Sequence, residues 1–298
     1  MKILYVANHQ AGQNDDEGAI AYALRQLGHE VAAVSEGDTQ AARSTPADLC
    51  LFHKWANFET VRRIGMVKVF WYFDRVVGWA DRRRRWMETM TPLVDVGFAT
   101  DGDWVDQSNR AEREADREEK MVFLPQGADE RVVGRGTPDP AQAVDVLCVA
   151  GTKFHGLQRQ SFVTELATFC AERGYTFRHV EEGIYREELR DLVASSKVVV
   201  APDSPVSDRY ASNRVWNMLG FGAFLLHPRC WFLIDEFGND VEWYESRPQL
   251  LKIVDWAMRL TYKARCRGSE AGLSKVRTMN LYRHRCQKLI SIVEERTK

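Results

Sequence analysis

Carboxylates stand at positions in this sequence where acid–base chemistry is feasible. Asp74 directly follows residues 67–73, an apolar and aromatic run that is typical of a strand. A carboxylate at the end of a strand can serve as a general base or can fix a hydroxyl group of a bound molecule. The same position is typical of a residue that caps a following helix. Asp74 is therefore the first candidate for a catalytic residue, and both interpretations stay open.

The first loop carries side chains suited to the same work. His9, Asp15, Asp16 and Glu17 lie around residues 8–16, between an apolar run and an amphipathic segment. His9 and Asp15 are candidates for contacting a substrate. Asp16 and Glu17 precede a segment with helical spacing, where an acid more often stabilises the helix dipole than acts as a base.

A glycine followed by polar residues forms the strand-to-helix turn near the middle of the chain. Gly151, Thr152 and Lys153 follow the apolar residues 144–150. Glycine permits a close approach of the backbone, and Thr and Lys side chains can reach a phosphate group. An ordinary strand-to-helix turn explains the same residues equally well.

Two basic clusters indicate where an anionic partner would bind. Residues 82–85 are four consecutive arginines, Arg83 and Arg84 among them, and Trp79 and Trp86 flank the run. Lys and Arg also far outnumber Asp and Glu in residues 252–298. Aromatic rings beside arginines suit a phosphate backbone with stacked bases. A charged run is more often a solvated helix face, and that interpretation stands beside the first.

The elements that position these residues alternate between strands and helices. In the first half, strands are expected at residues 3–7, 31–34, 49–53, 67–73, 94–99 and 121–124, with a helix at 17–27. In the second half, strands are expected at 144–150, 176–180, 198–201 and 223–226, and helices at 157–173, 187–194, 212–219 and after residue 248. Such alternation predicts parallel sheets covered by helices on both faces.

A Gly- and Pro-rich segment interrupts the alternation and predicts a division into domains. It runs over residues 134–142, where two glycines and two prolines cannot continue a helix or a central strand. We therefore expect a Rossmann-like domain at 1–133, a linker at 134–142, a second Rossmann-like domain at 143–275 and a final helix at 276–298. Ligands of such sheets bind beyond the carboxyl ends of the strands, so two domains facing across a cleft are expected.

Composition excludes several classes of protein. The chain has 298 residues, 45% of them hydrophobic and 28% charged, with a formal net charge of −1. These values are typical of a globular protein and provide no overall field for nucleic acid or anionic lipid. No apolar run is long enough to span a membrane, and the first residues do not form a signal peptide. The six cysteines are scattered, with no Cys-x-x-Cys pair. A cytoplasmic protein without a disulfide framework is expected.

The segment Ser-Asn-Arg-Val-Trp-Asn-Met-Leu-Gly-Phe-Gly-Ala-Phe-Leu-Leu at residues 212–226 resembles a motif of CgeB-like glycosyltransferases. Other segments resemble motifs of the same group and occur in the same order along the chain: Phe-Trp-Tyr-Phe-Asp at 70–74, Phe-Ala-Thr-Asp at 98–101, Leu-Pro-Gln-Gly-Ala-Asp at 124–129, Val-Ala-Gly-Thr at 149–152 and Leu-Tyr-Arg-His-Arg at 281–285.

The resemblance implies a GT-B fold, in which two Rossmann-like domains are closed by C-terminal helices. It implies a nucleotide-sugar donor, a UDP- or GDP-sugar, held mostly by the second domain, and an acceptor held mostly by the first. Arg214 is then assigned to the departing diphosphate, with Asn213 and the turn at 151–153 beside it. Asn217 stands where related enzymes commonly carry a Glu that binds the ribose, and an amide oxygen can accept the same hydrogen bond.

The resemblance leaves the acceptor open between a small molecule, a polysaccharide and modified DNA. Transfer onto hydroxymethylated bases of bacteriophage DNA is the alternative within the enzymes, and Trp79, Arg83 and Arg84 would then contact the acceptor. A relative that binds a nucleotide or polymer without catalysis is the alternative outside them. Asp101 and Asp103 form the Asp-x-Asp pattern of metal-dependent transferases of another fold. We expect Asp101 to begin a helix instead, and no metal or other cofactor.

Overall fold

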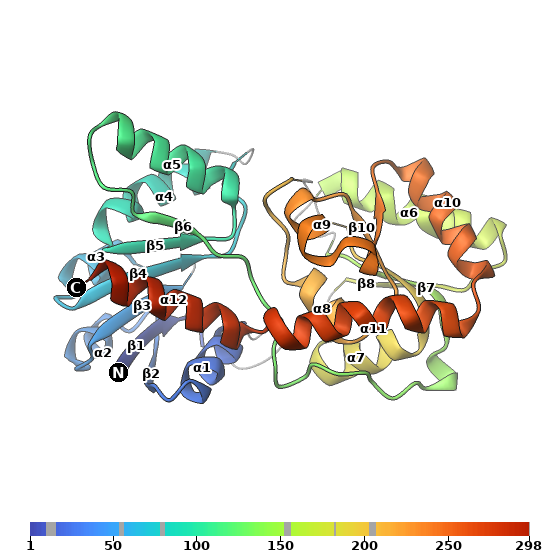
Figure 1. Cartoon of the computed structure of the whole chain (residues 1–298), viewed down its shortest axis with the longest axis horizontal. Coiled ribbons are helices and arrows are strands. Elements are labelled where there is room, and N and C mark those ends of the chain that lie inside the picture. The colour runs from blue at the N-terminus through green and yellow to red at the C-terminus, as the bar shows by residue number, and fades with distance from the viewer. Residues whose placement is uncertain are drawn as a thin grey trace. The chain divides into compact units, whose positions relative to one another are not determined.

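The computed structural model describes residues 1–9, 16–53, 57–77, 81–151, 156–181, 183–202 and 207–297 (Figure 1). The chain divides into two compact units. Unit 1 comprises Met1–Gln126 and Tyr282–Lys298, and unit 2 comprises Gly127–Leu281. Both are built on parallel sheets with helices between the strands, so the predicted α/β class is confirmed. No described helix is long and apolar enough to cross a membrane.

The described part of unit 1 is a six-stranded parallel sheet in the order β2-β1-β3-β4-β5-β6. Its strands are β1 (Lys2–Ala7), β2 (Glu30–Ser35), β3 (Leu49–His53), β4 (Val67–Tyr72), β5 (Val96–Ala99) and β6 (Met121–Phe123). Its helices are α1 (Asp16–Gln26), α2 (Thr39–Ser44), α3 (Phe58–Arg63), α4 (Asp81–Met90), α5 (Gly102–Glu114) and α12 (Tyr282–Arg296), with a 3₁₀ turn η1 (Thr91–Leu93).

Alternating residues of β4 fill the cores on the two faces of this sheet. Val69 and Trp71 belong to the core under α1 and α12, whereas Phe70 and Tyr72 belong to the core under α4 and α5. This alternation follows from the period of two along a strand. Trp71 is fully buried, and its indole N–H donates to the Leu124 carbonyl at 3.2 Å, so its one polar group is satisfied.

The described part of unit 2 is a five-stranded sheet in the order β11-β10-β9-β7-β8, and its strand pairs are parallel. Its strands are β7 (Val144–Val149), β8 (Phe177–Val180), β9 (Ser196–Val200), β10 (Leu225–Pro228) and β11 (Glu242–Tyr244). Its helices are α6 (Gly156–Glu172), α7 (Arg186–Ala194), α8 (Arg214–Gly220), α9 (Trp231–Phe237), α10 (Arg247–Arg259) and α11 (Tyr262–Met279), with 3₁₀ turns η2 (Pro140–Gln142) and η3 (Gly238–Asp240).

Two elements of unit 2 were not predicted, and the last helix begins later than expected. The sequence analysis placed no element between residues 226 and 248, where α9 and β11 lie. Both are short, and α9 has no side-chain N-cap bond, so neither leaves a strong pattern in the sequence. The expected helix at 276–298 is α12, which starts at Tyr282 because α11 ends at its C-cap residue Asn280.

The segment that was predicted to be a linker packs against unit 2. The backbone N–H of Thr137 donates to Asp191 Oδ1 at 3.0 Å, and that of Asp139 donates to Ser195 Oγ at 2.8 Å. The structure instead divides the units at Gln126–Gly127. Gly and Pro correctly indicated irregular backbone at 134–142, but irregular backbone can be fixed by side-chain acceptors as firmly as a regular element.

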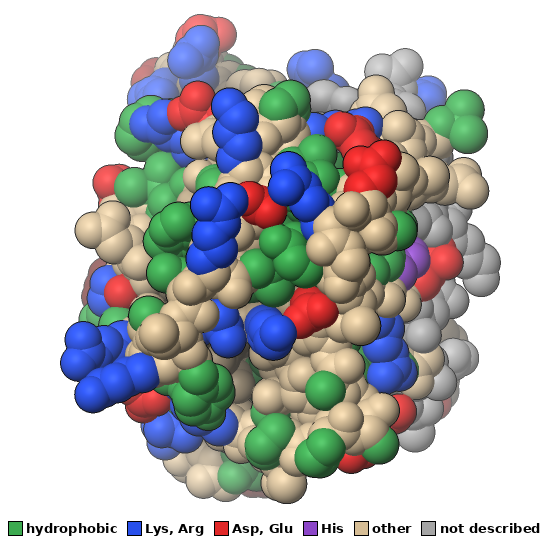
Figure 2. Space-filling view, turned by 90° about the vertical axis from the view of Figure 1, so that its right-hand side faces the viewer, with side chains coloured by type: hydrophobic (Ala, Val, Ile, Leu, Met, Phe, Trp, Pro, Cys, Tyr) green, Lys and Arg blue, Asp and Glu red, His purple; other side chains and the backbone are tan. Residues whose placement is uncertain are grey.

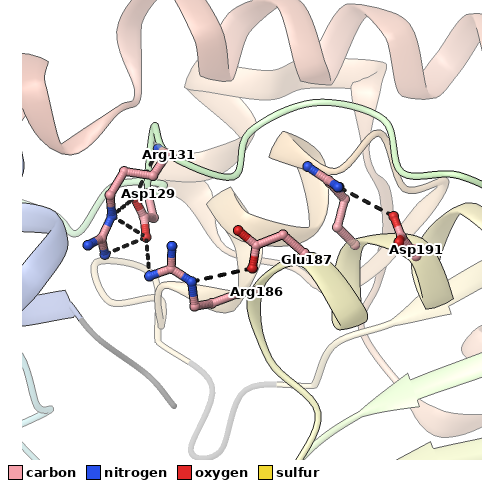
Figure 3. A network of polar contacts seen from close by, with 6 residues as sticks. Asp129, Arg131, Arg186, Glu187 and Asp191 are labelled. Carbon is pink, nitrogen blue, oxygen red and sulfur yellow. Dashed lines mark hydrogen bonds and ion pairs between the residues drawn. The ribbon is translucent and has the colours of Figure 1, made fainter. Parts of the chain in front are cut away.

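The two segments that connect the units run side by side where they meet unit 2. Ala128 forms a parallel bridge with Leu281, and its N–H donates to the Asn280 carbonyl at 2.8 Å. Asp129 forms an ion pair with Arg131, whose Nη2 donates to Oδ2 at 2.7 Å. The same Oδ2 lies 3.7 Å from Nη1 of Arg186 at the start of α7 (Figure 3). Arg186 has a positive φ of 51°, which costs energy in a non-glycine residue. This ion-paired network therefore anchors the connection to α7.

Gly136 tests whether the 134–142 segment is part of the folded unit. An added Cβ would lie 2.5 Å from the Arg190 carbonyl oxygen, which is closer than real Cβ contacts. We expect Gly136→Ala to lower the free energy of unfolding by about 1–3 kcal/mol in urea titration, because the backbone must shift. Gly65→Ala is the matched control, since an added Cβ there meets no atom within 4 Å. Equal stability of the two variants would contradict this packing.

Candidate functional site

The sheet of unit 2 has a switch point between β7 and β9. After β7 the chain adds β8 on one side of that strand and then β9 on its other side. The strand order therefore reverses between β7 and β9. Ligands of open α/β sheets bind beyond the carboxyl ends of strands at such points. Here those ends lead into Gly151 and Pro202.

Two arginines converge on this switch point. Arg214 is the first residue of α8, and its Nη2 donates to the Pro202 carbonyl at 3.2 Å. Arg159 in α6 is only 3% exposed, and its Nη1 donates to the Gly151 carbonyl at 2.8 Å. Burial raises the pKa of Cys148 in β7 to about 12, although both guanidinium groups oppose the shift. Both positive charges therefore act at the end of the same strand.

Arg159 was missed by the sequence analysis, although its position carries a signal. It shares helical spacing with Phe162, Leu166 and Cys170, which are buried in the core of unit 2. A guanidinium group on the buried stripe of a helix is costly unless it is hydrogen-bonded or faces a charged ligand. Arg159 could therefore have been identified from the sequence as a charged residue on the apolar face of a helix that follows a strand.

Of the remaining predicted donor residues, Gly151, Asn213 and Asn217 lie in the described part of the chain. Asn217 is one turn after Asn213, and its Oδ1 is buried without a hydrogen-bond donor among the described residues. The helix cap is Asn213 rather than Ser212, and its side chain makes no capping bond. Gly151 has no strained backbone, and an added Cβ would meet no described atom within 4 Å. Thr152 and Lys153 lie outside the described residues.

Unit 1 places a buried histidine at its own switch point, between β1 and β3. His53 ends β3 and is 1% exposed, and its Nε2 lies 3.5 Å from Glu17 Oε1 in the first turn of α1. The His53 ring meets Phe73 edge to face at 4.2 Å between centroids. His9 turns back onto the strand, where its Nε2 donates to the Tyr5 carbonyl at 3.1 Å. The sequence analysis did not single out His53, because only the sheet order brings it to Glu17.

Asp74 follows β4, and its carboxylate lies near the side chain of Arg83. Its Oδ2 lies 3.8 Å from Arg83 Nη2, and the two side chains are 35% and 27% exposed. The alternative interpretation of Asp74 as a helix cap is wrong, because residues 75–77, which follow it, are not helical. Asp74 and Arg83, which were predicted from separate segments, therefore belong to one cluster.

Asp101 fixes the backbone beside Asp74. It is fully buried, and its Oδ2 accepts from the Val76 and Val77 N–H groups at 2.7 and 2.8 Å. Its Oδ1 accepts from the Trp104 N–H at 3.3 Å as the N-cap of α5, which confirms that the Asp-x-Asp pattern begins a helix. Burial raises the pKa of Asp101, and the three amide donors oppose that shift. Asp101 therefore acts on Asp74 by positioning residues 76 and 77.

Arg84 and Trp86, which were predicted beside Arg83, are not brought into this cluster. Arg84 forms an exposed ion pair with Glu88 at 2.9 Å, one turn along α4. Trp86 packs into the core of unit 1 and stacks on Tyr72 at 5.5 Å, so its ring is not a platform for a base. Asp15 and Trp79 lie outside the described residues. In the described ranges, no three His, Cys, Asp or Glu side chains form a cluster that could hold a metal ion.

Comparisons with known proteins find similarity to one family model. Residues 153–291 match the family described as glycosyl transferase-like. A comparison with curated proteins gives no significant match.

Solved structures match over almost the whole chain. An α-glucosyltransferase in complex with UDP-glucose and DNA containing an abasic site has a TM-score of 0.71 at 10% identity, covering 98% of this chain and 99% of that one. A complex of an α-glucosyltransferase with UDP and a 13-mer DNA containing a HMU base has a TM-score of 0.70 at 10% identity, covering 99% of each. A trehalose-phosphate synthase (UDP-forming) from Burkholderia vietnamiensis has a TM-score of 0.70 at 10% identity, covering 100% of each.

The similarity to these structures establishes the fold. The chain has the two-domain GT-B fold, as the sequence motifs implied.

Replacing Asp101 tests its control of the Asp74 segment. Asp101→Asn leaves one acceptor oxygen, so either the Val76 and Val77 amides or the Trp104 amide loses its partner. We expect amide hydrogen exchange at these residues to accelerate about tenfold or more, as the loss of a buried hydrogen bond implies. Asp95→Asn is the control, because Asp95 accepts from the Lys68 N–H elsewhere in unit 1. Unchanged exchange at residues 76, 77 and 104 would refute the positioning role.

Proposed function

We propose that this protein is a glycosyltransferase that moves a sugar from a nucleoside diphosphate sugar to an acceptor hydroxyl group. The convergence of Arg159 and Arg214 on the switch point of unit 2 carries the proposal. A departing diphosphate gains negative charge in the transition state, and fixed cations stabilise that charge. The GT-B fold agrees, since the similar structures contain UDP or UDP-glucose.

The donor is held by unit 2 in this proposal. Arg214 and Arg159 face the diphosphate, and Lys153 with Thr152 and Gly151 completes the phosphate site from the turn after β7. Asn217 accepts a hydrogen bond from a ribose hydroxyl, which would satisfy its buried Oδ1. We expect UDP as the nucleotide, with GDP as the alternative, and a hexose as the transferred sugar.

The acceptor is held by unit 1 in this proposal. Asp74 accepts the proton of the acceptor hydroxyl, and Arg83, 3.8 Å away, orients that carboxylate. The buried Glu17–His53 pair offers a second base at the same edge of the sheet, and His9 lines that edge. The CgeB-like subgroup and a cytoplasmic location remain predictions from the sequence.

Transfer onto hydroxymethylated bases in DNA is the second candidate. The similarity to the α-glucosyltransferase complex with HMU-containing DNA favours it. The ion pair of Arg84 with Glu88 and the packing of Trp86 weaken the site first proposed for DNA. Trp79, Arg83 and the basic residues of α11 and α12 would then carry DNA binding.

The donor assignment is tested by removing each cation in turn. Arg214→Ala and Arg159→Ala should each lower turnover about a hundredfold, because each removes a stabiliser of the leaving group. Release of UDP or GDP is measured against a panel of sugar donors. Lys252→Ala, which removes an exposed cation of α10, is the control and should keep full turnover. Wild-type turnover in Arg214→Ala would overturn the assignment, and nucleotide binding without any release would identify a non-catalytic relative.

DNA as acceptor predicts a strong dependence on salt. Each phosphate contacted should contribute a slope of roughly −0.9 in log K against log salt concentration. Fluorescence anisotropy of labelled duplexes, with and without 5-hydroxymethylcytosine, measures this slope. Arg83→Ala should reduce the slope by about one, because its 3.8 Å contact with Asp74 is too long for a hydrogen bond. Arg84→Ala should change the slope little, because Glu88 hydrogen-bonds that side chain at 2.9 Å. Absence of binding at low salt would leave a small molecule or polysaccharide as acceptor.

A further inference from the structure

Gln126 is the last residue of the first part of unit 1, and its side chain is buried there. Charged side chains on the face shown in Figure 2, where Lys and Arg lie beside Asp and Glu, are in contact with water. Gln126 is only 5% exposed, so protein groups must satisfy its amide. Its Nε2 donates to the Phe73 carbonyl at 3.1 Å, but its Oε1 accepts no hydrogen bond from the described residues.

The Phe73 carbonyl determines the orientation of this amide. A carbonyl oxygen only accepts hydrogen bonds, so the nitrogen of the Gln126 amide must face it and the amide oxygen must face away. Thr100 Oγ1 donates to the same carbonyl at 2.8 Å. Phe73 and Thr100 are each 1% exposed, so water does not compete for these two bonds. The Phe73 carbonyl is thereby held by two buried side chains.

The backbone that carries Gln126 is itself anchored. The Leu124 N–H donates to the Ala99 carbonyl at 3.0 Å, and the Leu124 carbonyl accepts from the Trp71 indole at 3.2 Å. The Gln126 carbonyl accepts from Arg285 Nε of α12 at 3.0 Å. Gln126 therefore acts on Phe73 from a fixed position, next to the point where the chain first leaves unit 1.

These contacts act on Asp74 through one peptide group. The Phe73 carbonyl and the Asp74 N–H belong to the same planar unit, so an orientation imposed on the carbonyl is passed to the Asp74 backbone. Asp101 holds the Val76 and Val77 N–H groups, which follow Asp74 in the sequence. The backbone is therefore fixed both before and after Asp74.

We infer that Gln126 is a positioning residue, which sets the direction of the Asp74 carboxylate through the peptide group between Phe73 and Asp74. The inference rests on the proposed function, in which Asp74 accepts the proton of an acceptor hydroxyl group. That transfer requires the carboxylate within hydrogen-bond reach of the hydroxyl, and a misplacement of about 1 Å can lower the rate about a hundredfold. The bond from Gln126 Nε2 narrows the range of positions that the carboxylate can take.

Gln126→Leu separates positioning from stability. It removes the buried Oε1 that lacks a donor, and the Phe73 carbonyl keeps its bond from Thr100, so the melting temperature should stay equal or rise. The turnover number kcat should fall about tenfold, because Asp74 is less well positioned. KM for the donor should change less than about twofold, because unit 2 holds the donor in our proposal.

Asn109→Leu is the matched control. Asn109 is also a buried amide, and its Nδ2 and Oδ1 bond the Met121 carbonyl and N–H at 2.9 and 3.2 Å, at the start of β6. Its replacement should lower the melting temperature and leave kcat unchanged at temperatures where both variants are folded. Wild-type kcat in Gln126→Leu, or an equal fall of kcat in Asn109→Leu, would overturn the inference.

Gln126→Glu tests the hydrogen bond itself by its pH dependence. A protonated carboxyl group donates to the Phe73 carbonyl as the amide does, whereas an ionised one cannot donate, and burial raises the pKa of an introduced carboxyl group. The kcat of this variant relative to the wild type should therefore be highest at about pH 5 and fall as the pH rises. A relative kcat at about pH 5 that is no higher than that of Gln126→Leu would overturn the role of the donor.

A measurement without turnover separates this inference from the proposed function. The sequence contains a single Phe-Asp pair, at residues 73–74, so carbonyl carbon-13 labelling of Phe with nitrogen-15 labelling of Asp gives one NMR signal from that peptide group. Gln126→Leu should shift the Phe73 carbonyl resonance upfield, because a hydrogen bond is lost, whereas Asn109→Leu should leave it in place. An unchanged resonance in Gln126→Leu would overturn the inference whether or not the protein transfers a sugar. Absence of transfer by the wild type, together with the shifted resonance, would instead contradict the proposed function.

Discussion

The return of the C-terminal helix into unit 1 is the interaction on which the first unit and its site depend. The Tyr282 hydroxyl donates to Asp16 Oδ1 at 2.8 Å, and Leu289 and Val293 are buried in the core under α1 (Figure 1). Arg285 donates to the Gln126 carbonyl at 3.0 Å. Unit 1 is therefore completed by the last residues of the chain, and its core requires contacts of very long sequence separation. Burial and Asp16 raise the pKa of Tyr282, so its hydroxyl stays a donor.

The two units bury opposite charges at the carboxyl ends of their strands. Unit 2 buries Arg159 there, with the half-buried Arg214 at the same end, whereas unit 1 buries Glu17 and Asp101. Buried charges are expensive and persist only where hydrogen bonds or a ligand compensate them. Cations suit a departing diphosphate, and carboxylates suit a hydroxyl group that must lose a proton. The division of charge agrees with the proposal that unit 2 holds the donor and unit 1 the acceptor.

Several sequence motifs have a structural explanation that differs from direct contact with a ligand. Asp129 of the Leu-Pro-x-x-Ala-Asp motif holds Arg131 and Arg186, and thereby anchors the crossing segment to α7 (Figure 3). Thr100 of the Phe-Ala-Thr-Asp motif donates to the Phe73 carbonyl at 2.8 Å, beside Asp74. Thr100 thus supports the backbone next to the proposed site, and Asp129 supports the connection to α7. Sequence patterns alone do not distinguish such roles from direct binding.

The sequence by itself determined the strands other than β11, the main helices and the class of fold, because hydrophobic periodicity is local and survives in any tertiary context. It also indicated Arg214 and Asp74 through motifs at strand ends. Only the tertiary structure paired His53 with Glu17, placed Arg159 beside Arg214 and fixed residues 134–142 to unit 2. The order of strands in a sheet decides which strand ends meet, and that order rests on long-range packing, which no local pattern encodes.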